Sequence, residues 1–269
     1  MTNTPEDNHA PPPRTPRIPC TPRSETMPVD VLDRFELICE PLESLRPEEY
    51  PTRQALAAAA VLAVDAVGIS VLIDGQIRVP LGASSDQATA AESLEFTLGG
   101  GPCLHAHAIE RPVLVPDVTD RTAQVWTRWP QYAHELLART PFRSVFAFPL
   151  TSGGLTIGTL SLYRRDTGDL STVEFGDALA VTNRIFYDLL DTGTFSGAAK
   201  PALRWLNLPL AVIRGNVWQA IGIATVELAL NPADALALLR SYCYAHDQLL
   251  DDIAADVISR RLPLDQLHP

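Results

Sequence analysis

The sequence lacks several features that would assign it directly to a class of protein. Its four cysteines are widely spaced and form no Cys-x-x-Cys pair, which favours reduced thiols over a disulfide framework. The apolar run 55–64 has about half the length that is needed to span a bilayer, and the N-terminal residues carry no signal-peptide core. These absences predict a soluble cytoplasmic protein with no membrane partner.

Basic residues are also scarce, and Lys200 is the only lysine. The chain has 32 acidic against 21 basic residues and a net charge of -11. Such a chain repels the phosphate backbone of nucleic acids and the surface of anionic membranes, so binding to either needs a local patch. We expect no DNA partner.

Length and composition indicate two folded domains. The 269 residues are 46% hydrophobic, which is enough to build cores in both. Eight of the 23 prolines fall in residues 1–28, where few large apolar side chains accompany them, so a disordered tail is predicted there. We place the domains at 29–192 and 205–263, with a turn-rich connector over 193–204 and a short tail over 264–269.

The pattern of the first domain predicts an α+β fold. Helical periodicity covers 29–46 and 51–66, and two alternating runs flank an Asp-Gly turn at 74–75. A helix over 85–95, a short strand over 112–115 and a Thr-, Asp- and Trp-rich loop follow. A second hairpin joins 143–150 to 155–163, and Ser171 with Glu174 forms a capping box for a helix to about 190. Hairpin connections predict an antiparallel sheet flanked by helices.

Past residue 205 only helical periodicity remains. One apolar face runs from 208 to 228, Asn231 and Pro232 start a second helix, and a third covers 249–258 before Pro263. The sequence therefore predicts a small all-α unit of three helices.

The first candidate site is the glycine-rich bend that contains Gly101, Pro102 and Cys103. Glycines allow close backbone approach, and the N-terminus of a following helix attracts anions or carbonyl groups. Cys103 and His107 would share a helical face, but no cluster of three or four metal ligands is visible, so we predict no metal. Spacing alone favours the alternative, a tight turn that binds no ligand.

Aromatic residues mark a second part of the same candidate pocket. Trp126, Trp129 and Tyr132 lie near Asp117 in the sequence, and they either line a ligand pocket or form a small core under a loop. The sequence contains no Gly-x-Ser-x-Gly or His-Glu-x-x-His motif, and we expect no catalytic residues and no enzyme.

Arginines of the C-terminal unit are candidates for phosphate contacts. They include Arg214, Arg260 and Arg261. Residues 197–269 nevertheless hold six Lys or Arg against seven Asp or Glu, so a binding surface needs these arginines on one face.

Residues 30–192 resemble a GAF domain. The motifs that carry the resemblance are Leu98-Gly-Gly-Gly-Pro-Cys103, Arg111-Pro-Val-Leu-Val-Pro-Asp117, Arg128-Trp-Pro130, Val145-Phe-Ala-Phe-Pro-Leu150 and Ile157-Gly-Thr-Leu-Ser-Leu-Tyr163. The resemblance implies a six-stranded antiparallel sheet with a pocket for a small ligand, or a dimerisation platform. No motif identifies the ligand or a cofactor.

Residues 205–263 resemble an ANTAR domain, the RNA-binding output of bacterial antitermination regulators. The matching segments are Val217-Trp-Gln-Ala-Ile-Gly222, Pro232-Ala-Asp-Ala-Leu236, Leu250-Asp-Asp-Ile-Ala254 and Val257-Ile-Ser-Arg-Arg-Leu262. The resemblance implies that Ala220, Gly222 and Arg240 lie near RNA and that Ala235 and Ala254 are structural. Many members carry a lysine where this chain has Ile221, which removes one phosphate contact.

The two resemblances together predict a signal-responsive transcriptional regulator that acts as a homodimer. Its sensor domain would detect a small molecule or a redox signal, and its helical unit would bind structured leader RNA hairpins to prevent termination. Two alternatives stay open: a dimerisation and protein-interaction module that binds no RNA, and an enzyme resembling the free methionine sulfoxide reductases.

Overall fold

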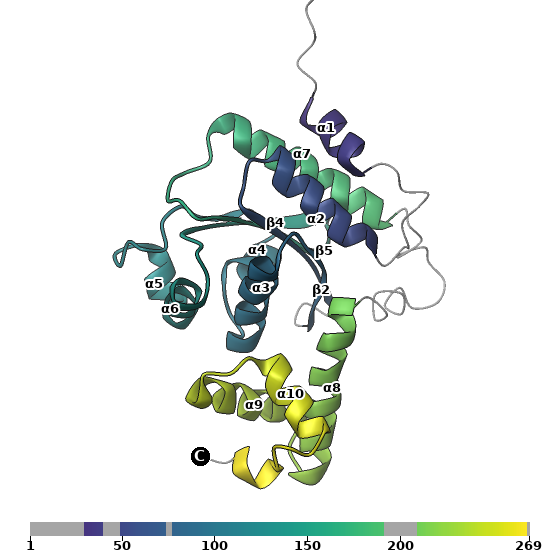
Figure 1. Cartoon of the computed structure of the whole chain (residues 1–269), viewed down its shortest axis with the longest axis vertical. Helices are drawn as coiled ribbons and strands as arrows, with labels where there is room; N and C mark the ends of the chain where they lie inside the picture. The colour runs from purple at the N-terminus through teal and green to yellow at the C-terminus, as the bar shows by residue number, and fades with distance from the viewer. Residues whose placement is uncertain (1–29, 40–48, 74–76, 191–208, 268–269) are drawn as a thin grey trace, which may run out of the picture.

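A five-stranded antiparallel sheet lies between two layers of helices, and three more helices form a separate unit beside one layer (Figure 1). The computed structural model describes residues 30–39, 49–73, 77–190 and 209–267. The strand order is β2-β1-β5-β4-β3, and every neighbouring pair is antiparallel. The strands are β1 (Ala66–Ile73), β2 (Ile77–Ala83), β3 (Val113–Val115), β4 (Ser144–Ser152) and β5 (Leu155–Arg164).

One face of the sheet is covered by α1 (Val31–Cys39), α2 (Tyr50–Val61) and α7 (Thr172–Leu189). Alternate strand residues point to this face and are apolar, including Ile69, Phe148 and Leu160. The predicted capping box of α7 is present: the Ser171 hydroxyl accepts from the Glu174 backbone N–H, and the Glu174 carboxylate accepts from the Ser171 N–H. This layer is the larger apolar core of the domain.

The opposite face is covered by α3 (Asp86–Leu98) and α4 (Pro102–Ile109), with α5 (Gln124–Arg128) and α6 (Pro130–Arg139) outside them. Ser85 caps the start of α3, and Gly99 ends it with φ at 71°, a left-handed conformation that favours glycine. The prediction of a loop over the Trp-rich segment is wrong, because α5 and α6 form there. Tyr132, Ala133 and Leu136 of α6 are buried against this face.

The C-terminal unit contains α8 (Pro209–Glu227), α9 (Pro232–His246) and α10 (Leu250–Ile258), as the helical periodicity predicted. The Asn231 side chain accepts from the Asp234 N–H and caps α9, which confirms the predicted helix start. A tail was predicted over 264–269, but residues 264–267 form a 3-10 helix whose two leucines are buried against α9. The unit has its own apolar core.

The helical unit packs directly on the sheet domain. The contacts run from α8 to β2, from α3 to α9 and from α3 to α10. Among the described residues no single helix meets the length and hydropathy expected of a membrane span; only 215–227 and 232–246 taken together do, and they meet at a 111° bend.

Other boundaries also differ from the sequence predictions. The helix predicted over 51–66 ends at Val61, because the chain turns at Ala63, whose φ is 50°, and β1 begins at Ala66. The described residues form five strands, where the resemblance implied six. The predicted tail 1–28, the hairpin turn at 74–75 and the connector 193–204 lie outside the described residues.

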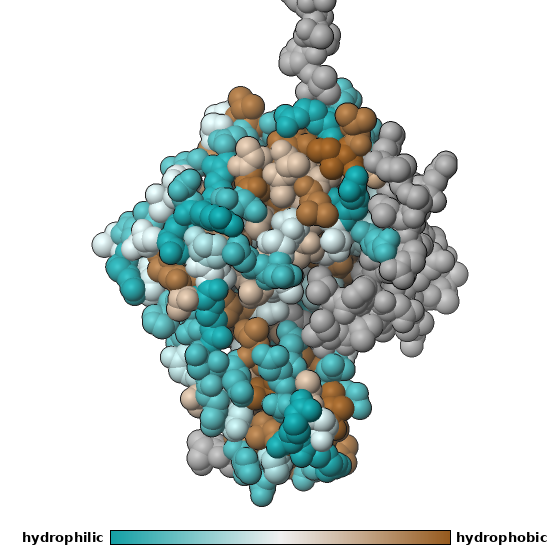
Figure 2. All heavy atoms as spheres, viewed as in Figure 1, coloured by the Kyte–Doolittle hydropathy of each residue, from teal (hydrophilic) through white to brown (hydrophobic). Residues whose placement is uncertain are grey.

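The visible surface mixes hydrophilic and apolar side chains (Figure 2). Apolar side chains show over α1 and α2, where Leu37 and Leu56 are exposed. Single exposed apolar side chains of this kind are normal for a folded protein, so this view does not single out a functional patch.

Candidate functional site

Arg78 is the centre of a buried polar network between the sheet and α3. Its side chain is 2% exposed and leaves β2 toward the carboxylates of Glu92 and Glu95 on α3. Nη2 donates to Glu92 Oε2 at 2.5 Å, and Nη1 donates to Glu95 Oε2 at 2.9 Å. Ser70 Oγ, the Glu92 carbonyl and Ser161 Oγ accept the remaining three N–H groups. All five donors of the guanidinium are therefore satisfied.

We call Arg78, Glu92, Glu95, Ser70 and Ser161 the Arg78 network. It extends further into the sheet face through hydroxyl groups. Tyr163 donates from its hydroxyl to Glu92 Oε1 at 2.7 Å, and Thr159 shares a hydrogen bond with Ser70. Such networks are stable only when every member is satisfied, so the geometry of this region is tightly specified.

Two glycines make room for the carboxylates. A Cβ atom at Gly68 would lie 2.6 Å from Glu92 Cδ, and a Cβ atom at Gly101 would lie 2.1 Å from Glu95 Oε1. Gly101 has φ at 165°, which is extended backbone, so it is close approach and not strain that requires glycine here. The glycine-rich bend thus serves to bring Glu95 against the start of α4.

Glu95 occupies the place where the sequence predicted a ligand. Its Oε1 accepts the backbone N–H of Cys103 at 2.7 Å, within the first turn of α4. Unsatisfied N–H groups and the helix dipole favour an anion at such a position. The anion attracted by the Gly101–Cys103 bend is therefore a carboxylate of the protein itself.

Burial sets the protonation of the network. Burial raises the pKa of Glu95, and the Arg78 guanidinium opposes this shift. For Arg78, burial alone would lower the pKa, but Glu92, Cys103 and Glu95 hold it well above its usual value. The network therefore keeps a fixed cation, while Glu95 is more easily protonated than a free glutamate.

Cys103 is fully buried, and its Sγ lies 3.0 Å from Ser161 Oγ. Burial and then the charge of Glu95 raise the pKa of its thiol well above the usual value, which disfavours the nucleophilic thiolate. Cys39 and Cys243 belong to two other cores. No group of three or more His, Cys, Asp or Glu side chains in the described part of the chain is placed to hold a metal ion.

Of the three other predicted ligand residues, Trp129 lies against the glycine-rich bend, where a Cβ atom at Gly100 would be 3.5 Å from its Cδ1, whereas Asp117 and Trp126 belong to a loop. Trp126 donates from Nε1 to the Val118 carbonyl and stacks under Arg121, and Asp117 accepts from the N–H groups of Thr119 and Asp120. Trp129 contacts the His105 ring edge-on, at 5.5 Å between centroids. Pro102 is buried at the first turn of α4. The structure thus brings Trp129 to the bend that contains Gly101, Pro102 and Cys103, but it uses Asp117 and Trp126 to hold a loop.

Two polar side chains near the network have no partner. Tyr132 is 1% exposed and its hydroxyl makes no hydrogen bond, while burial and then Glu95 and Cys103 raise its pKa well above the usual value. Both ring nitrogens of His107 are also buried without a partner, and burial lowers its pKa. Unsatisfied buried donors are rare and mark a place where a polar molecule would be stabilised.

The residues predicted to bind RNA do not share one surface. Ala220 is fully buried in the core of the helical unit, whereas Gly222 is exposed with open space beside it. Arg240 points toward α3, where its Nη2 donates to the Phe96 carbonyl at 2.9 Å. The predicted face is therefore divided between a core, a surface and a contact with the sheet domain.

Arg260 and Arg261 lie at the end of α10, on the exposed part of the helical unit. Arg260 pairs with Glu227 at 3.1 Å and Arg261 with Asp256 at 2.6 Å. Both arginine side chains are more than half exposed. The side chain of Arg214 lies outside the described residues.

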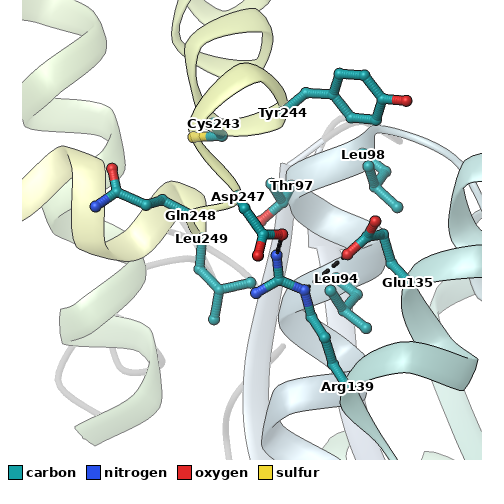
Figure 3. Close-up of a pocket in the computed structure, with 10 residues that line it drawn as sticks. All are labelled: Leu94, Thr97, Leu98, Glu135, Arg139, Cys243, Tyr244, Asp247, Gln248 and Leu249. Atoms are coloured by element: carbon teal, nitrogen blue, oxygen red, sulfur yellow. Dashed lines mark hydrogen bonds and ion pairs between the residues drawn. The ribbon is translucent and has the colours of Figure 1, made fainter.

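A shallow groove runs between α3, α6 and α9 (Figure 3). Arg139 of α6 crosses it and pairs with both Glu135 and Asp247. The water-accessible space in this groove is about 20 Å³, enough for about one water molecule. The groove is thus an interface between the two units and has no room for a metabolite.

The sequence did not predict the Arg78 network. Glu92 and Glu95 have the spacing of a solvated helical face, and 14 residues separate Arg78 from Glu92. One signal in the sequence could have predicted it: Arg78 stands among apolar residues of a predicted strand. In the structure Val79 and Leu81 of the same strand are buried. A charge at such a position needs a buried partner.

Comparisons with known proteins identify one part of the chain. Residues 52–182 match the GAF domain family, and a search of curated proteins finds no match to the chain. Similar solved structures include the GAF domain of a phosphoenolpyruvate-protein phosphotransferase from Coxiella burnetii, with 12% identity, TM-score 0.47, and 62% of this chain and 96% of that chain covered.

Two further similar structures are a bilin-bound domain and an enzyme. The phycoerythrobilin-bound GAF domain of a cyanobacterial phytochrome is 13% identical, with TM-score 0.44 and 62% and 96% of the two chains covered. The free methionine-R-sulfoxide reductase of Neisseria meningitidis is 14% identical, with TM-score 0.40 and 60% and 91% covered. The family match shows a GAF domain at residues 52–182, which is a module for sensing small molecules or for interaction.

Proposed function

We propose that this chain is a signal-responsive regulator in which the GAF domain senses a small molecule and the helical unit binds structured leader RNA to prevent transcription termination. The observation that carries the proposal is the direct packing of the helical unit on α3, the helix that bears Glu92 and Glu95. A conformational change in the GAF domain can therefore reach the helical unit through α3.

The sensed molecule carries a small anionic group. Such a group finds two attractive features at the position of Glu95: the N-terminal turn of α4 and the Arg78 guanidinium. Burial raises the pKa of Glu95, and this desolvation opposes a buried ligand anion as much as it opposes the Glu95 carboxylate. A ligand anion that displaces it would also meet the unpartnered hydroxyl of Tyr132.

Removal of the Glu95 side chain tests the anion site. We expect Glu95→Ala to lower the melting temperature and acetate or formate, but not chloride at equal ionic strength, to raise it again, since a ligand that binds only the folded state stabilises it. Asp177→Ala, which removes a carboxylate of α7 outside the Arg78 network, is the control and gains nothing specific from acetate. Equal effects of acetate and chloride on Glu95→Ala would contradict the proposal.

The RNA contact in the output unit includes the exposed residues Gly222, Arg260 and Arg261. The proposal assigns Arg240 to the same contact once it leaves α3. It assigns no catalytic role to Cys103, because its thiol is buried, its pKa is raised, and the other described cysteines lie in other cores. We expect the active form to be a homodimer in the cytoplasm.

Binding to a synthetic RNA with two tandem hairpins tests the output function. We expect loop-dependent binding that weakens with salt, because phosphate contacts release counterions. Arg260→Ala with Arg261→Ala should reduce the affinity, while Arg165→Ala, which removes an exposed arginine of the GAF domain, should not. Binding that is equal for RNA with scrambled loops would contradict the proposed recognition.

A protein-interaction output is the second candidate. Two observations favour it: Arg240 is engaged with α3, and the two exposed arginines that follow α10 are already paired with acidic residues. In this case the purified chain forms a stable dimer and binds no RNA at any salt concentration. The hairpin experiment separates the two candidates.

A further inference from the structure

Helix α3 belongs to the cores of both units. The Phe96 side chain, 2% exposed, lies in the apolar core of the helical unit with Val217 and Leu239. In return, Leu249, the residue before α10, packs into the core of the GAF domain that contains Leu94 and Tyr132. Each unit therefore places one large apolar residue in the core of the other.

The helices of the two units also satisfy each other at their ends. Leu249 occupies the N-cap position of α10 and has no side-chain acceptor, and the Leu250 N–H donates instead to Thr97 Oγ1 of α3 at 3.2 Å. At the C-terminal end of α3, the Arg240 guanidinium of α9 donates to the Phe96 carbonyl. Orphan groups at helix ends need such partners, so both helices depend on the contact between the units.

Arg240 is deeply engaged in this contact. Its guanidinium lies over the Phe96 ring at 5.7 Å, and a Cβ atom at Gly99 would be 2.8 Å from Nη1. Burial lowers the pKa of Arg240, and its Nε has no hydrogen-bond partner. An arginine without a carboxylate partner is costly to bury, so this contact is one that the protein can release.

Consecutive residues in one turn of α3 contact the Arg78 network and the helical unit. Glu95 binds Arg78 and the Cys103 N–H, while its neighbours Phe96 and Thr97 bind the helical unit. A helix moves as a rigid element, so a displacement that frees Glu95 from Arg78 also moves Thr97.

We propose that α3 couples the Arg78 network to the helical unit, and that in the conformation described here this contact holds the half-buried Arg240 against α3 and away from RNA. The contact is autoinhibitory: displacement of Glu95 shifts α3, opens the contact at Thr97 and Phe96, and exposes Arg240. The coupling itself needs only the two units, whereas the consequence for RNA affinity rests on the proposed function.

Hydrogen exchange of the full chain without RNA tests the coupling. Thr97→Val keeps the shape of the side chain but removes the acceptor of the Leu250 N–H, and it should speed exchange at the start of α10 by about tenfold. Glu95→Gln should speed exchange in α3, at the start of α10 and at the end of α9. Thr182→Val is the matched control, because Thr182 is a buried threonine of α7 that bonds only to its own helix.

The control should speed exchange in α7 and leave α9 and α10 unchanged. If Glu95→Gln changes exchange only in α3 and α4, α3 does not couple the two units and the proposal is overturned. Circular dichroism of each variant confirms that the helices are retained.

Hairpin RNA then tests the withholding of Arg240. Thr97→Val should bind RNA several-fold more tightly than the native chain, and adding Arg240→Gln should remove the gain. If exchange rises at α10 but RNA affinity does not change, the release of Arg240 is overturned. If neither protein binds RNA while exchange is still coupled, the proposed RNA function fails and the coupling stands.

Discussion

The two faces of the sheet are both buried, but they are buried by different chemistry. Toward α2 and α7 the fully buried strand side chains are apolar, such as Ile69, Phe148 and Leu160. Toward α3 and α4 the neighbouring strand positions present Ser70, Arg78, Thr159 and Ser161. Because successive residues of a strand point to opposite faces, one sheet carries both environments.

The comparison shows which face of the sheet depends on the identity of individual side chains. An apolar face depends on volume, and it tolerates exchanges between side chains of similar size. The Arg78 network depends instead on each partner, since the loss of one group leaves the others buried without compensation. The polar face is therefore the one that can respond to the arrival of a ligand, and the helical unit packs on the helix that covers it.

Removing the central cation should have the largest effect on this comparison. Arg78→Met leaves Glu92 and Glu95 buried without their partner, and we expect a loss of about 4 kcal/mol in the free energy of unfolding. Leu160→Ala on the apolar face should cost about 3 kcal/mol, by transfer and cavity formation. Urea denaturation with tryptophan fluorescence measures both.

The two faces should differ in whether further substitutions restore the lost stability. Adding Glu92→Gln and Glu95→Gln to Arg78→Met removes the uncompensated charges and should restore most of the lost stability. No neutralising substitution should restore Leu160→Ala. The proposed difference between the faces is wrong if Arg78→Met lowers the free energy of unfolding less than Leu160→Ala does and the triple variant is no more stable than Arg78→Met.

Much of the fold could be predicted because local signals agree with the tertiary structure. Alternation of apolar residues predicted the two hairpins, and the caps at Ser171 and Asn231 predicted the starts of α7 and α9. Helix α6 was missed although its sequence held a signal: Pro130 stands at the first helical position, followed by the buried residues Tyr132, Ala133 and Leu136. The density of Thr, Asp and Trp around it favoured a loop.

The candidate site was only half predicted. The Gly101–Cys103 bend was correctly placed at a helix start, but its anion comes from Glu95, which looks like a solvated residue in the sequence. Likewise, Arg240 was singled out by resemblance, yet no pattern within α9 indicates that its partner is the Phe96 carbonyl, 144 residues away in the sequence. Contacts over such separations depend on how the units dock, which the sequence pattern does not contain.

The smallest effect should come from the unpartnered imidazole on the polar face. Burial lowers the pKa of His107 below the usual value of 6.5, so the unfolded chain binds a proton more readily than the folded one. Stability should therefore rise with pH up to about 6.5, and fall as the pH drops below this value and the unfolded chain takes up its proton. In His107→Gln the slope of unfolding free energy against pH should flatten in this range, as measured by urea denaturation at a series of pH values.

His105, whose pKa burial and Arg128 also lower, leaves a residual slope in the variant. The ring nitrogens of His107 make no hydrogen bond in the folded protein. If His107→Gln leaves the slope of unfolding free energy against pH unchanged, water must reach this imidazole in the folded state. Helix α4 would then open to water without unfolding of the protein.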